Sequence, residues 1–270
     1  PVKCVLSCPA WPTDRENTVN LPRVLLAFVL LVGARPASVM AVEFRVAVAS
    51  NFRGAAQEIA AGFEAASGHR AVLIFGSTGK HYAQIVHGAP FEVFLAADTE
   101  RPERLERSGH AVAGTRFTYA LGRLALWSAD PERVVDGAAL LERGDFRRLA
   151  IANPALAPYG RAARETLEAL GAWQAAEPRL VTAENVAQAY QFVASGNAEV
   201  GLVAGPLLLQ DEAGPRGSWW LVPETLHAPI AQQALLLREH PGGRAFLAYL
   251  RGPEALAILR ARGYGVPDDF

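Results

Sequence analysis

The chain has 270 residues, of which 51% are apolar, and a formal net charge of −1. This length allows a sizeable hydrophobic core, in one large domain or in two smaller ones. The near-zero charge provides no basic field for nucleic acid, so we expect no nucleic-acid partner and no ligand held by net charge.

The first predicted segment is an export signal over residues 1–41. Arg23 precedes an apolar run over residues 24–32, and Val39-Met40-Ala41 has the form of a cleavage site. The run is too short to cross a bilayer, which takes about 20 residues. A buried core helix is the alternative. We expect the segment to be removed and the mature protein to be periplasmic.

The next part of the chain alternates strands and helices. Apolar runs separated by amphipathic stretches, with Gly68 as a helix stop, predict this order. The predicted strands are 44–49, 71–75 and 91–96, and the predicted helices are 52–67, 80–88 and 99–107. A βαβαβ order of this kind predicts a parallel sheet with helices on both faces.

A glycine-containing, loop-like stretch then interrupts the pattern at Gly109, Gly114 and Gly122. Beyond it we predict strands at 123–127, 149–152, 179–182, 200–203, 219–222 and 230–237, and helices at 159–170, 184–196, 241–251 and 253–262. The chain therefore divides into lobe 1, residues 42–121 with about 229–270, and lobe 2, about 122–228. We predict an α/β fold of two lobes with a ligand cleft between them.

Two of the predicted strands end in the same kind of polar junction. Ser50-Asn51 follows the first strand and Ser77-Thr78 follows the second, each directly before a helix. Hydroxyl groups beside the free N–H groups of a helix start suit a small oxyanion. Taken singly, each pair is also an ordinary helix cap.

The sequence gives little support for other kinds of site. The loop before Lys80 lacks the first glycine and the final Ser or Thr of a nucleotide phosphate loop. The six histidines show no metal-ligand spacing, and we expect them on the surface. Ser50 or Ser77 with His81 is the only remote arrangement for a secreted α/β hydrolase. We therefore expect no enzyme, no metal and no cofactor.

Several segments together resemble the periplasmic molybdate-binding proteins of ABC importers, over about residues 44–265. They are Ala49-Ser50-Asn51-Phe52, Gly76-Ser77-Thr78-Gly79-Lys80, the run from Gly88 to Asp98, Asn153-Pro154 through Pro158-Tyr159-Gly160, Gly171-Ala172-Trp173, Ala183-Glu184-Asn185-Val186 and Gly201-Leu202-Val203. The resemblance implies a type II periplasmic-binding-protein fold with mixed sheets. It also implies a monomer that delivers molybdate or tungstate to a membrane permease; sulfate or another oxyanion is the alternative.

The resemblance also implies the binding residues. These are Ser50, Asn51, Ser77, Tyr159 and, through its backbone N–H, Val186. One departure concerns Ala204, where many members of the family carry a ligand-bonding Tyr, and the Tyr159 hydroxyl is the expected replacement. Lys80 and Arg53 lie near these loops, and we expect both to face solvent.

Overall fold

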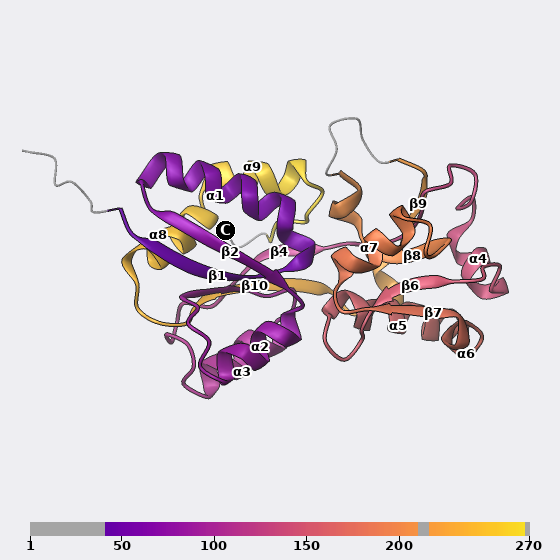
Figure 1. The fold of residues 1–270 in the computed structure, drawn as a ribbon, viewed down its shortest axis with the longest axis horizontal. Coiled ribbons are helices and arrows are strands. Elements are labelled where there is room, and N and C mark those ends of the chain that lie inside the picture. Colours follow the sequence, from indigo (N-terminus) through magenta and orange to yellow (C-terminus); the bar gives the residue numbers. More distant parts are fainter. Residues whose placement is uncertain (1–40, 210–215, 268–270) are drawn as a thin grey trace, which may run out of the picture. The chain divides into compact units, whose positions relative to one another are not determined.

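The computed structural model describes residues 41–209 and 216–267, and the predicted export segment lies outside them apart from Ala41. Within this part of the chain the strands form two mixed sheets, each flanked by helices (Figure 1). The predicted α/β class is therefore confirmed. No helix among the described residues combines the length and the apolar character that crossing a membrane requires.

The first sheet contains five strands in the order β2-β1-β3-β10-β4. They are β1 (Glu43–Ala49), β2 (Arg70–Gly76), β3 (Val93–Leu95), β4 (Phe117–Gly122) and β10 (Ile230–Leu236). β1 is parallel to both β2 and β3, whereas β10 is antiparallel to β3 and β4. The predicted parallel βαβαβ unit is thus confirmed and is extended by two antiparallel strands.

Alternating side chains of β1 explain why helices cover both faces of this sheet. Phe44, Val46 and Val48 pack with helices α1, α8 and α9, whereas Ala47 packs with α2 and α3 on the opposite face. The helices are α1 (Arg53–Ser67), α2 (Thr78–Val86), α3 (Glu100–Arg107), α8 (Pro241–Leu250) and α9 (Pro253–Ala261). Gly68 ends α1 with a φ of 72°, the left-handed conformation that glycine adopts most easily.

The second sheet has the order β7-β6-β8-β5-β9 and is also mixed. Its strands are β5 (Leu124–Ser128), β6 (Leu149–Ala152), β7 (Leu180–Ala183), β8 (Val200–Ala204) and β9 (Ser218–Leu221). Its flanking helices are α4 (Gly137–Arg143), α5 (Pro158–Ala169), α6 (Trp173–Ala176) and α7 (Val186–Ala194). Short 3-10 helices are η1 (Ser50–Phe52), η2 (Glu177–Arg179), η3 (Gly205–Leu209) and η4 (Glu224–Leu226).

The chain passes between the sheets twice. It leaves the first sheet at the end of β4, enters β5 one residue later, and returns between β9 and β10. The strands of the first sheet lie within residues 43–122 and 230–236, and those of the second sheet lie within residues 124–221. The lobe boundaries at about 122 and 229 stay predictions.

Several elements differ from the prediction, among them β4 and α4. The stretch before residue 123, interpreted as loop-like, contains β4, which pairs with β10. Its partner lies more than a hundred residues away, so no local pattern marks the pairing. Helix α4 was not predicted either; Asp136 caps it by accepting a hydrogen bond from the Ala139 N–H at 3.1 Å.

Candidate functional site

Ser50 and Ser77 lie side by side at the carboxyl ends of two neighbouring parallel strands. Ala49 and Gly76, the residues just before them, are partners in the β1–β2 register. Both serines are buried, with 4% and 2% of their surfaces exposed. The two polar junctions therefore meet at the same edge of the sheet.

The two serines differ in how their hydroxyl groups are used. The Ser77 oxygen caps α2 by accepting a long hydrogen bond from the Lys80 N–H, at 3.4 Å. The Ser77 proton is not needed for this cap and is free to point elsewhere. The Ser50 side chain makes no hydrogen bond to another described residue. The sheet edge thus presents two buried hydroxyl groups that can donate.

Tyr159 and Val186 lie at the starts of two helices of the second sheet. Pro158 begins α5 with a suitable φ, and Tyr159 follows it with its side chain almost fully buried. Asn185 caps α7, and Val186 is the first residue of that helix. The first N–H groups of a helix have no carbonyl partner within it, so both helices present free donors.

Hydrogen bonds between the two sheets bring these segments together. The Gly79 N–H, in the first turn of α2, donates to the Leu156 carbonyl at 2.8 Å. Lys80 pairs with Glu184 at 2.8 Å, just before α7. A single cluster of buried residues contains Ala49 and Ala97 from the first sheet and Tyr159 and Val186 from the second. The structure therefore brings together the chain segments that carry the five predicted binding residues.

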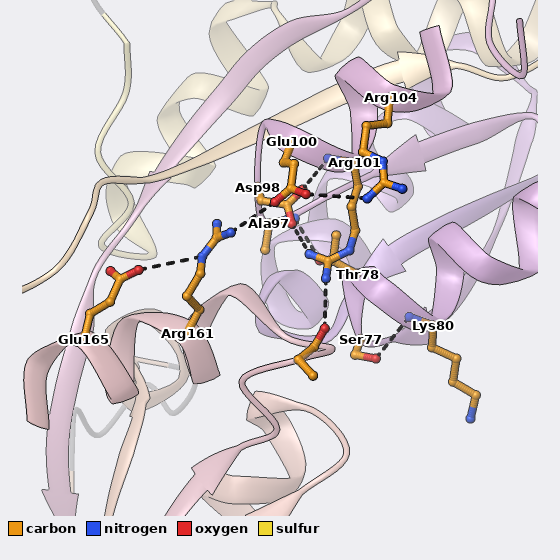
Figure 2. A network of polar contacts seen from close by, with 11 residues as sticks. Ser77, Thr78, Lys80, Ala97, Asp98, Glu100, Arg101, Arg104, Arg161 and Glu165 are labelled. Carbon is orange, nitrogen blue, oxygen red and sulfur yellow. Dashed lines mark hydrogen bonds and ion pairs between the residues drawn. The ribbon is translucent and has the colours of Figure 1, made fainter. Parts of the chain in front are cut away.

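A network of ion pairs and hydrogen bonds lies close to Ser77 and Thr78, as Figure 2 shows. Arg101 pairs with the buried Asp98. It also donates to the Ala155 carbonyl at 3.1 Å, and this hydrogen bond joins α3 beside the first sheet to the loop after β6 in the second. Burial raises the pKa of Asp98, and the charge and hydrogen bonds of Arg101 oppose that rise. Arg161 of α5 pairs with Glu100 of α3 at 3.2 Å. These charged side chains are thus paired with one another.

The two cations expected to face solvent do so. Lys80 is half exposed and pairs with Glu184, and Arg53 is exposed with its guanidinium 4.0 Å from the Phe75 ring centre.

A buried polar network lies beneath Asn51. The Asn51 amide donates to Gln232 Oε1 at 2.8 Å, and Tyr119 donates to the same oxygen at 3.1 Å. Tyr264 donates to the Asn51 carbonyl at 2.8 Å. Burial raises the pKa of all three tyrosines, Tyr119, Tyr159 and Tyr264, so each hydroxyl keeps its proton at neutral pH.

Sequence reasoning missed this network and misplaced three histidines. Tyr119 and Gln232 lie on β4 and β10, far from every motif that marked the site. His69, His81 and His227 are buried, so the expectation that all six histidines lie on the surface was wrong. The His81 ring lies 3.2 Å from the Val48 carbonyl and 3.1 Å from Gln84, inside the first lobe. Its position at the fourth residue of α2 on a buried face was the available signal.

The described residues contain no group of three His, Cys, Asp or Glu side chains placed to hold a metal ion. What they do bring together is a set of buried hydroxyl groups and helix-start N–H groups. Such a set can donate hydrogen bonds to an anion.

Comparison with known proteins agrees with this chemistry. The molybdate-binding protein ModA of Azotobacter vinelandii is 46% identical over 250 residues, covering 92% of this chain and 98% of that protein. ModA of Rhodobacter capsulatus is 48% identical over 255 residues, covering 93% and 98%. The solved structure of the Azotobacter vinelandii periplasmic molybdate-binding protein has a TM-score of 0.80 at 41% identity, covering 83% of this chain and 99% of that one.

The family profile agrees with these relatives. It carries the description bacterial extracellular solute-binding protein and matches residues 44–265. That span includes both sheets and every predicted binding residue. The chain belongs to this family of bacterial extracellular solute-binding proteins and has its two-lobed α/β fold.

Proposed function

We propose that this protein captures molybdate between its lobes and delivers it to a membrane ABC permease. The meeting of four chain junctions, which carry Ser50, Asn51, Ser77, Tyr159 and Val186, is what supports the proposal. The names of the relatives at 46% and 48% identity support the same ligand.

The donors match the charge state of molybdate. At neutral pH the ion is a dianion without a proton, so it only accepts hydrogen bonds. Bonds to a charged group contribute about 1.5–3 kcal/mol each, and helix starts add favourable dipoles. Four or five such donors therefore hold the ion without a contacting Lys or Arg.

The same reasoning ranks other anions. Tungstate has the same charge and shape and nearly the same size, so it should bind about equally well. Sulfate has the same charge but is smaller, and a sulfate-binding protein remains the second candidate on this scaffold. Hydrogen phosphate carries a proton that would face a donor, which costs binding energy.

The proposal includes the setting in which the protein works. It acts as an exported, periplasmic, monomeric binding protein without a cofactor and without catalytic activity. The His81 ring is held by Val48 and Gln84 and makes no hydrogen bond to the hydroxyl group of Ser50 or Ser77, which weakens the hydrolase alternative.

Isothermal titration of the chain from about residue 42 with molybdate, tungstate and sulfate tests the proposal. We expect molybdate and tungstate to bind with similar affinity, and sulfate much more weakly. Stronger binding of sulfate would move the function to the alternative. No binding of any of the three would refute it.

A further inference from the structure

In the buried hydrogen-bond network around Gln232, the donor and the acceptor of each bond can be derived from one backbone carbonyl. The Asn51 carbonyl can only accept, so the Tyr264 hydroxyl at 2.8 Å must donate its proton to it. The Tyr264 oxygen can then only accept from the Asn51 side chain, 3.4 Å away. The atom of Asn51 that faces both Tyr264 and Gln232 is therefore its amide nitrogen.

The same logic orients Gln232. Its side-chain atom 2.8 Å from the Asn51 nitrogen has to be the oxygen, and this oxygen also accepts from Tyr119 at 3.1 Å. The other end of Gln232 is then its NH₂ group, which donates to the Tyr159 oxygen at 3.5 Å. Gln232 is fully buried, so water does not compete for either end.

This arrangement leaves the proton of Tyr159 unused within the network. Tyr159 accepts from Gln232 and donates to no other described residue. Hydrogen bonds from Gln232 and Asn51 also lower the pKa of Tyr159, as donors to its oxygen should, against the larger effect of burial. Gly122 leaves room for the contact, because a Cβ there would collide with the Tyr159 hydroxyl.

We propose that Gln232 is a positioning residue that turns the Tyr159 hydroxyl into an obligatory donor toward the bound oxyanion. Gln232 does not touch the ion; it acts through Tyr159 and Asn51. The inference rests on the proposed function and adds to it a reason why Tyr159 offers its proton, rather than a lone pair, to the anion.

Substituting Gln232→Glu tests the proposal, because an ionised Glu has two acceptors and no donor. It would accept the Tyr159 proton and so remove that donor from the anion. A protonated Glu keeps one donor and one acceptor and restores the original direction. The other titratable groups that face this position are Tyr119, Tyr159 and Tyr264, and burial holds the pKa of each above its usual value.

The readout is molybdate affinity at about pH 6 and about pH 8.5. We expect Gln232→Glu to bind about 10- to 100-fold more weakly than wild type at the higher pH, with a smaller deficit at the lower pH. The matched control is Gln233→Glu on the same strand, whose side chain contacts Arg116 and Thr118 instead. It should bind like wild type at both pH values.

A second pair of variants separates proton direction from simple charge repulsion. In a Tyr159→Phe background the new Glu has no hydroxyl to capture, so its pH-dependent loss should shrink. Equal losses in the two backgrounds would overturn the proposal. The proposal would also be overturned if Gln232→Glu bound molybdate as tightly as wild type at both pH values, or if its affinity were reduced by the same factor at both.

Folding of the variants is checked by thermal melting without ligand. If Gln232→Glu does not fold, Gln232→Leu replaces it, and we expect a pH-independent loss of affinity; unchanged affinity would refute the role of Gln232. Failure of wild type to bind molybdate would instead refute the proposed function, so the two failures are distinct.

Discussion

Ser77 is the residue at which a capping role and a binding role can be separated. Its oxygen caps α2, and we propose that its proton binds the anion. Ser77→Ala should weaken molybdate binding by about 1.5–3 kcal/mol, the value of one hydrogen bond to a charged group. Asp136→Ala is the matched control, since it removes the cap of α4 without a proposed ligand contact. Both variants should lose about 1 kcal/mol of stability, measured by urea unfolding, and only Ser77→Ala should lose affinity.

His81 makes stability depend on pH. Burial lowers its pKa below 6.5, against the hydrogen bonds with Gln84 and Val48 that raise it. The folded protein therefore binds fewer protons than the unfolded chain as pH falls below about 6.5, and its free energy of unfolding decreases. Urea unfolding at about pH 7.5 and about pH 5.5 should show a larger decrease for wild type than for His81→Gln. His87→Gln, at an exposed position just beyond α2, should keep the wild-type decrease.

For single residues, the sequence indicated the site residues that directly follow strands, but not the buried residues that lie within strands and support them. Ser50 and Ser77 stand out because a polar pair ends an apolar run. Gln232 lies within β10, 181 residues after Asn51 in the sequence. Only the pairing of β10 with β3 and β4 brings it near Asn51. No local pattern carries that information.

The start of α2 lies directly against the second lobe. The Gly79 N–H donates to the Leu156 carbonyl, and a Cβ at Gly79 would lie only 2.7 Å from that oxygen. Gly79→Ala should therefore oppose closure of the lobes and weaken molybdate binding by about 1–3 kcal/mol, a typical cost of overpacking. Ala is also the better helix former, by up to about 1 kcal/mol. Melting of the ligand-free variant should thus be unchanged or raised, and a lowered melting temperature would contradict this account.

Element prediction succeeded where the signal was local. Strands β6 and β8 are continuous buried runs without a charged residue, and β1 becomes an apolar run from Val46 to Ala49, which is what strands buried on both faces require. Strand β4 lies partly exposed at the sheet edge, so its apolar pattern is incomplete and its glycine-rich flank favours a loop interpretation.

For the whole molecule, we expect one bound ion to contact both lobes, because the proposed binding residues come from both. A ligand that binds only the folded, closed protein stabilises it by about 4.1 kcal/mol at 1,000 times its Kd. For a chain of this size that corresponds to about 2–4 °C per kcal/mol in the melting midpoint. Molybdate and tungstate should raise the midpoint to a similar extent.

Hydrogen phosphate supplies the contrast for this whole-molecule prediction, because it is a tetrahedral dianion that carries one proton. If the buried donors of both lobes point at the ion, that proton meets no acceptor, and phosphate should give little or no rise at the concentration at which molybdate saturates. Arsenate, which is larger and also carries a proton at neutral pH, should behave like phosphate. A rise with arsenate but not with phosphate would show that ion size, rather than the direction of the hydrogen bonds, sets the selectivity.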